Sequence, residues 1–77
     1  MLLLNYNQTG DKMLKIKELR EDRDLTQQEL AKFLNISQQA YSHYEVGDRE
    51  ISLDLLIKLA NFYNVSLDYI VGRSIKK

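Results

Sequence analysis

Four hydrogen-bonding side chains recur at helical spacing near the middle of this 77-residue sequence. They are Gln38, Gln39, Ser42 and His43. At roughly 100° per residue, one helix places all four on one arc and mostly apolar residues on the opposite arc. Amide, hydroxyl and imidazole groups can hydrogen-bond the edges of DNA bases. The pattern predicts a helix that reads bases, and an ordinary solvated helix face is the alternative interpretation.

Catalysis and metal binding have little support in the sequence. It contains one His and no Cys. Its Ser and Asp residues stand mainly where they can cap helices, which explains them without any chemistry. A catalytic triad or a metal site needs partners that this sequence lacks. We therefore expect no enzyme, no cofactor and no metal site, and nothing implies a small-molecule ligand.

Capping signals divide the chain into five short helices. The strongest signal is Thr26 followed by Glu29, which forms a capping box in front of the second helix. Serines precede the last three helices, and Asn or Gly follows the last four. The expected helices cover residues 12–23, 27–34, 38–45, 53–63 and 67–71. Brief turns between them predict an all-α bundle.

The sequence from residue 16 to residue 72 resembles the helix-turn-helix proteins of the phage-repressor and Cro type, the XRE family. The matching residues are Leu25, Thr26, Gln27, Glu29, Leu30, Ala31, Ile36, Ser37, Tyr44, Glu45, Gly47, Leu59, Ala60, Val65, Ser66, Leu67, Asp68 and Gly72. The resemblance implies a compact five-helix, lambda-repressor-like bundle. Val46 replaces a small polar residue common in the family, so a side-chain phosphate bond is lost there. Ile51 stands where proline is common, which costs some loop rigidity.

The resemblance also implies roles for individual residues at a DNA surface. It places the third expected helix in the major groove of double-stranded DNA. The implied base contacts are Gln38, Gln39, Ser42 and His43. Glutamine can bind adenine through two hydrogen bonds, and the histidine can donate to guanine or to a phosphate. Gln27 stands where the family sets a side chain and a backbone N–H against phosphate, and Lys32 and Arg49 are phosphate candidates by charge.

Two charged residues fall on the inward arcs of the expected helices, where a lone charge is costly. They are Arg20 in the first helix and Glu45 at the end of the third. In similar repressors, an arginine of the first helix pairs with the glutamate that ends the third. The resemblance therefore implies a partly buried structural ion pair between Arg20 and Glu45.

The charge balance is unusual for a protein that binds nucleic acid. There are 11 basic and 11 acidic residues, and residues 26–49 carry two basic side chains against three acidic ones. Since phosphate contacts supply most non-specific affinity for DNA, that affinity should be weak. Two functions stay open. One is a sequence-specific DNA-binding regulator of phage, prophage or antitoxin type, which the polar arc favours. The other is a protein-interaction module that keeps the fold without useful DNA affinity.

The chain is expected to contain an N-terminal arm over 1–11, the helix-turn-helix domain over 12–72 and a basic tail over 73–77. The arm is either a loose extension or a segment that packs on the domain or pairs with a second chain. The absence of Cys and of any apolar run long enough to span a bilayer favours a cytoplasmic protein.

A homodimer on a palindromic operator is expected, because one reading helix covers only a few base pairs. An apolar group near the last two helices is the candidate pairing surface, with the arm over 2–4 as its rival. This group consists of Phe62, Tyr69, Ile70, Val71 and Ile75. Ile70 is expected to point inward, and the alternative is that the whole group only closes the small core. The sequence names neither the operator nor any regulated gene or effector.

Overall fold

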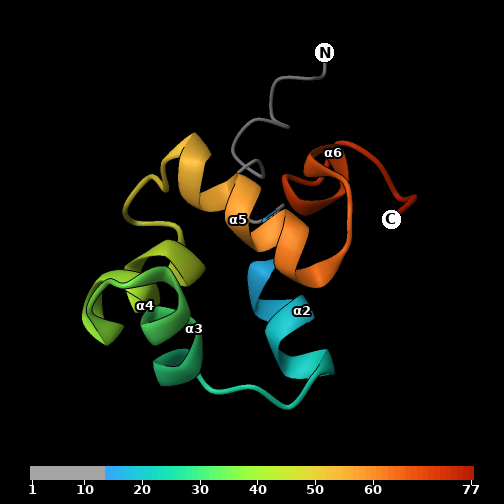
Figure 1. Ribbon diagram of the computed structural model, residues 1–77. Coiled ribbons are helices and arrows are strands. Elements are labelled where there is room, and N and C mark those ends of the chain that lie inside the picture. The colour runs from blue at the N-terminus through green and yellow to red at the C-terminus, as the bar shows by residue number, and fades with distance from the viewer. Residues whose placement is uncertain (1–13) are drawn as a thin grey trace.

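The computed structural model of the protein describes residues 14–77, and this part of the chain contains helices and no strand. The helices are α2 (Ile16–Asp22), α3 (Gln27–Leu34), α4 (Gln38–Val46), α5 (Leu53–Tyr63) and α6 (Leu67–Ile70). In Figure 1, α5 lies at the centre, α2 lies below it, α3 and α4 lie on one side and α6 on the other. This arrangement confirms the expected all-α fold.

The helix boundaries agree with the expected ranges to within one residue, except at the start of the first helix. The segment over 12–23 was expected to be helical, but α2 begins only at Ile16. The expectation was wrong for Leu14 and Lys15, and residues 12 and 13 lie outside the described part of the chain, as does the arm over 1–11. The physical reason is a tertiary contact, because the N–H of Lys15 donates to the carbonyl of Ile70 at 2.9 Å.

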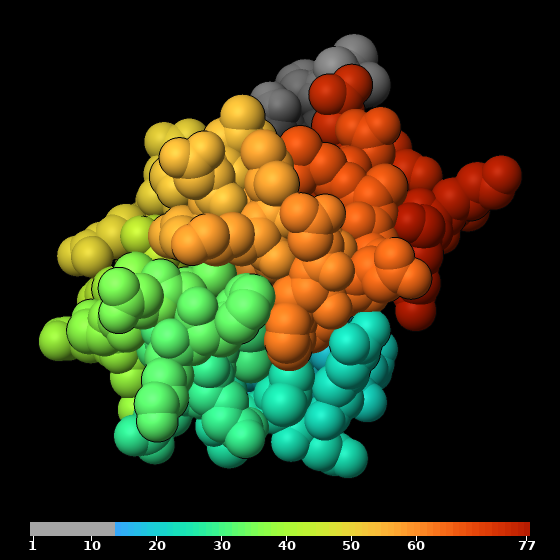
Figure 2. All heavy atoms as spheres, viewed as in Figure 1, coloured from blue at the N-terminus to red at the C-terminus, as the bar shows by residue number. Residues whose placement is uncertain are grey.

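The core is formed by apolar side chains from every described helix. The buried set comprises Ile16, Leu19, Leu30, Ala31, Leu34, Tyr41, Ile51, Leu56, Leu59, Ala60, Tyr63 and Ile70. Each fully buried side chain of Leu size contributes roughly 1.5–3 kcal/mol of burial free energy. In the space-filling view of Figure 2, α3 and α5 meet with their side chains in contact. The core therefore fixes the helix-turn-helix segment directly onto the central helix.

Ile51 contributes to this core from the loop between α4 and α5. Its side chain is only 7% exposed. In the sequence, Ile51 is notable only because proline is common at this position in the family. The structure shows that the side chain is a core residue, so its burial helps to hold the loop against the domain.

The last residues of the chain fold back on α6. The N–H of Ser66 donates to the carbonyl of Lys77 at 2.8 Å, and the N–H of Arg73 donates to the carbonyl of Asp68 at 2.8 Å. The ammonium group of Lys77 lies 5.9 Å from the centre of the Tyr69 ring, a distance that permits a cation–π contact. These contacts keep the basic tail on the α6 side of the molecule, away from α3 and α4 (Figure 1).

Candidate nucleic-acid interface

The two helices of the candidate interface, α3 and α4, are capped as the sequence predicts. The Thr26 hydroxyl accepts the N–H of Glu29 at 3.1 Å, and the N–H of Thr26 donates to the Glu29 carboxylate at 2.7 Å. At the start of α4, the Ser37 hydroxyl accepts the N–H of Ala40 at 3.0 Å. These bonds satisfy donors that the first turn of a helix otherwise leaves unpaired.

A tight turn sets the angle between α3 and α4. Asn35 adopts the left-handed conformation with a φ of 62°. This reversal allows the N–H of Ile36 to donate to the carbonyl of Ala31 at 3.0 Å. Ala31 is only 2% exposed, so a larger side chain there would force the packed helices apart. The turn and the small residue together define the orientation of α4.

The polar arc of α4 is unevenly exposed. Gln38 and Gln39 are exposed, whereas Ser42 and His43 are half-buried. Tyr41, on the opposite face, is completely buried. The buried tyrosine anchors the helix, and the two glutamines at its N-terminal end project from the domain. Base reading by these four polar residues stays a prediction.

Arg20 and Glu45, which the resemblance pairs, lie in direct contact. The Arg20 Nε donates to Glu45 Oε2 at 2.7 Å, and Nη2 donates to Oε1 at 3.1 Å. A third guanidinium bond, from Nη1, reaches the carbonyl of Leu25 at 2.9 Å. The side chains are 13% and 2% exposed, respectively. This two-bond contact ties α2 to the C-terminal end of α4 across the start of α3.

The ion pair controls the protonation of Glu45. Burial alone would raise the pKa of this carboxyl group, but hydrogen bonds from Arg20 and Gln27 outweigh burial and lower the pKa below its ordinary value. The guanidinium pKa of Arg20 is raised, chiefly by its hydrogen bond to Glu45. Both groups are therefore charged in the folded protein at neutral pH.

Gln27, a predicted phosphate contact, is bound to this network. Its side-chain Nε2 donates to Glu45 Oε1 at 3.0 Å. An amide nitrogen carries two hydrogens, so one donor is used and one stays free. The backbone N–H of Gln27 also lies in the first turn of α3, where helical N–H groups have no partner within the helix. Gln27 therefore retains two donors for a phosphate while its position is set by Glu45.

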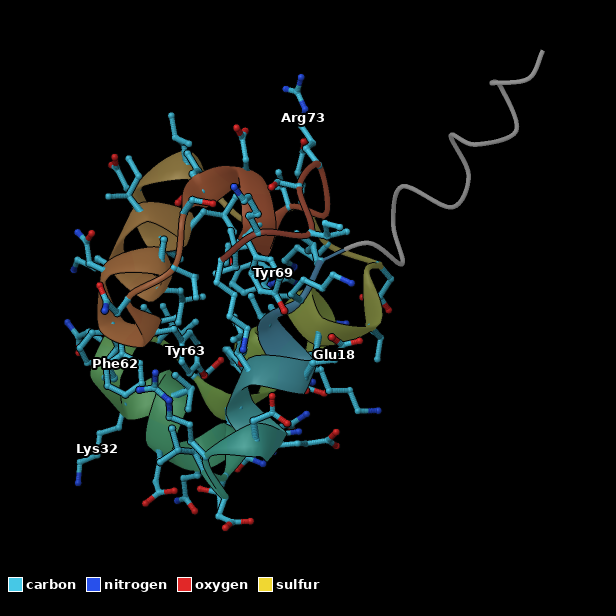
Figure 3. All side chains as sticks on the ribbon, turned by 90° about the vertical axis from the view of Figure 1, so that its right-hand side faces the viewer. Glu18, Lys32, Phe62, Tyr63, Tyr69 and Arg73 are labelled. Carbon is cyan, nitrogen blue, oxygen red and sulfur yellow. The ribbon has the colours of Figure 1, made fainter. Side chains whose placement is uncertain are left out.

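The two basic phosphate candidates flank α4. Lys32 of α3 lines a shallow hollow of about 370 Å³ together with Gln28 and Gln38, and Figure 3 shows its side chain extending away from the domain. Arg49 is exposed in the loop that follows α4. A cation thus lies near each end of the helix, and phosphate binding by these two residues stays a prediction.

Two residues at this surface were not singled out from the sequence. Gln28 lies beside Lys32, and the i, i+4 spacing of the two residues on α3 was the available signal. Asp48 contacts His43, with its Oδ1 at 2.8 Å from the imidazole Nδ1. No helical spacing connects this pair, because the left-handed Gly47 lies between them with a φ of 87°.

The residues of the expected pairing surface differ widely in exposure. Ile70 is completely buried in the monomer, as expected, whereas Ile75 is 98% exposed. Phe62 is 36% exposed, and its ring packs against Phe33 at 4.7 Å between centroids, with the two planes tilted by 39°. A second exposed apolar group, not expected from the sequence, is formed by Leu53 and Ile57 of α5. Tyr69 and Val71 are half-buried.

The sequence profile of the helix-turn-helix family matches residues 16–70, a range that contains all the described helices. The chain belongs to the helix-turn-helix family. Within this family domain, α3 and α4 are the two helices of the motif. No solved structure gives a significant match to the chain.

The chain is similar in sequence to transcriptional regulators, a phage repressor and an antitoxin from bacteria. The HTH-type transcriptional regulator ImmR of Bacillus subtilis (strain 168) is 44% identical over 59 residues, which cover 77% of this chain and 46% of that protein. The cryptic phage CTXphi transcriptional repressor RstR of Vibrio cholerae is 38% identical over 60 residues, or 78% of this chain and 54% of that protein. The antitoxin PezA of Streptococcus pneumoniae is 42% identical over 57 residues, or 74% of this chain and 36% of that protein. The chain thus spans about half the length of the first two and about a third of the last.

Within residues 14–77, no cluster of His, Cys, Asp or Glu is arranged to hold a metal ion. The helices of the same region are too short and too polar for any of them to cross a membrane.

Proposed function

We propose that this helix-turn-helix protein is a sequence-specific DNA-binding transcriptional regulator that reads the major groove with α4. The observation that carries the proposal is that α4 exposes Gln38 and Gln39 on its polar arc, while its opposite face is held by Tyr41 and by the Arg20–Glu45 pair. A rigidly held helix can place hydrogen-bonding side chains in a constant register against base edges. The names of the relatives, which include transcriptional regulators and a phage repressor, support the same function.

In this proposal, phosphate contacts orient the domain and α4 supplies the sequence information. Gln27 and Lys32 bind the backbone on the α3 side, and Arg49 binds it beyond the C-terminal end of α4. The described surface near α4 has few cations, so affinity for random DNA is low and most of the useful binding energy comes from base contacts. The protein acts in the cytoplasm and carries no enzymatic activity.

We further propose that two copies bind a palindromic operator, with half-sites about one helical turn (~34 Å) apart. Ile75 and Phe62 are the apolar side chains best placed to pair between copies on the α5–α6 side. Sedimentation of the wild-type chain, of Ile75→Glu and of a chain that starts at Met13 tests this surface. Loss of the dimer in Ile75→Glu would support pairing through the α6 side. Loss of the dimer only in the shortened chain would assign pairing to the arm. A wild-type chain that is a monomer both with and without operator DNA would refute pairing.

Selection from a pool of randomised DNA duplexes tests the function itself. The wild-type protein should enrich a two-fold symmetric site and bind it far more tightly than unselected DNA. A protein that enriches no sequence and binds all duplexes equally weakly would instead support the protein-interaction module, which the formal neutrality of the sequence favours.

A further inference from the structure

The histidine of α4 is held by a carboxylate from beyond the helix. His43 is the only histidine in the sequence. Its Nδ1 lies 2.8 Å from Oδ1 of Asp48. The left-handed Gly47 ends α4, and the contact shows that Asp48 returns to the last turn of the helix. An ionised carboxylate has no hydrogen to donate, so in this contact the imidazole Nδ1–H is the donor.

This contact determines which imidazole nitrogen is a donor and which is an acceptor. In a neutral ring only one nitrogen carries a hydrogen, so a hydrogen on Nδ1 leaves Nε2 with a free lone pair. Within the described part of the chain, Asp48 is the only hydrogen-bonding partner of the ring. The side chain of His43 remains 38% exposed. The neutral histidine therefore presents an acceptor, and no donor, on its free nitrogen.

An acceptor on the reading helix distinguishes among the four bases. In the major groove, cytosine N4 and adenine N6 are donors, whereas guanine N7 and O6 and thymine O4 are acceptors. We infer that Asp48 is a specificity-determining positioning residue. By holding the neutral ring of His43 with its hydrogen on Nδ1, it makes the histidine select cytosine or adenine and reject guanine at a pH where the ring is neutral. The inference rests on the proposed reading of DNA by α4, and it differs from the sequence-based expectation that His43 donates to guanine.

The hydrogen position can be measured in the free protein, independently of DNA. A single histidine gives one set of imidazole ¹⁵N signals, and long-range ¹H–¹⁵N correlation at alkaline pH identifies the protonated nitrogen. The wild-type ring should carry its hydrogen mainly on Nδ1. Asp48→Asn should move it toward Nε2, because an amide can donate to a bare Nδ1. A wild-type ring protonated mainly on Nε2 would overturn the inference, whatever the protein does with DNA.

A matched variant controls for charge. Glu50→Gln removes the same negative charge from the same exposed loop but leaves the Asp48 contact in place. Its ¹⁵N pattern should equal that of the wild type. A change in Glu50→Gln as large as that in Asp48→Asn would show that loop charge governs the ring, and would also overturn the inference.

Base preference is then measured by selection from randomised duplexes at the same pH. The position that loses preference in His43→Ala is the one that His43 reads, and the wild type should prefer cytosine or adenine there. Asp48→Asn should reduce this preference about two- to tenfold, which corresponds to the net free energy of one hydrogen bond. Preferences at the other positions of the DNA site should stay unchanged. A wild-type preference for guanine at that position, or an unchanged preference in Asp48→Asn, would refute the inference. A wild-type protein that selects no sequence at all would refute both this inference and the proposed function. The other outcomes would refute the role of Asp48 alone and leave the proposed function standing.

Discussion

The two faces of α4 have opposite relations to the rest of the protein. On the inward face, Tyr41 is completely buried, and Glu45 accepts hydrogen bonds from Arg20 and Gln27. On the outward face, Gln38 and Gln39 are exposed. The inward face sets the position of the helix, and the two glutamines of the outward face leave their side-chain donors and acceptors available to a ligand. Substitutions on the two faces should therefore separate stability from recognition.

The largest expected effect follows from removing the buried anion. Glu45→Ala leaves the Arg20 guanidinium, only 13% exposed, without its buried carboxylate partner. Removing one member of a buried ion pair typically destabilises a protein by about 3–5 kcal/mol. Chemical denaturation should show this loss. Glu50→Ala, at an exposed position, is the control and should change stability by no more than about 0.5 kcal/mol. An unchanged midpoint in Glu45→Ala would mean that the inward face does not anchor α4 through this pair.

A smaller effect should appear as a pH dependence of stability. The pKa of Glu45 is lowered in the folded state from the ordinary value of 4.5, despite its burial, because of its hydrogen bonds from Arg20 and Gln27. The unfolded chain therefore binds this proton more readily, so the stabilisation is present above the ordinary pKa and is lost as pH falls through the folded-state pKa. Unfolding free energies measured from neutral to acidic pH should fall less steeply in Glu45→Gln than in the wild type. Identical slopes in the two proteins would exclude Glu45 as a source of the acid sensitivity.

The smallest expected effect concerns the salt dependence of DNA binding. The outward surface has few cations, so log K should fall with log salt as expected for only ~3–5 phosphate contacts per subunit. Lys32→Ala should reduce that slope by about one, uniformly across sequences. Lys77→Ala, on the α6 side of the domain, should leave it unchanged. A steep wild-type slope, or equal slopes in wild type and Lys32→Ala, would show that other cations bind the backbone.

The features that the sequence predicted well are local ones. The Thr26–Glu29 capping box and the left-handed Asn35 depend on residues a few positions apart, so residue type and spacing suffice to locate them. The pairing of Arg20 with Glu45 was also anticipated, but only because the family resemblance joined two positions 25 residues apart.

The features that the sequence did not reveal depend on the tertiary arrangement. The late start of α2 follows from the bond between Lys15 and Ile70, which joins opposite ends of the domain. The burial of Ile51 and the return of Asp48 to His43 both depend on the path of one loop. Loop paths have no periodicity, so neither the burial of Ile51 nor the contact between Asp48 and His43 could be deduced from sequence spacing.

The central claim, that the outward face of α4 reads bases, is tested most directly by the DNA sequence preference of Gln39→Ala. Sites selected by this variant and by the wild type are compared at equal salt, alongside the unfolding midpoints of both proteins. The account predicts loss of about 1–3 kcal/mol of discrimination at one base pair in each half-site, with the midpoint unchanged. If Gln39→Ala retains the full wild-type preference at every position, α4 does not read DNA in this way.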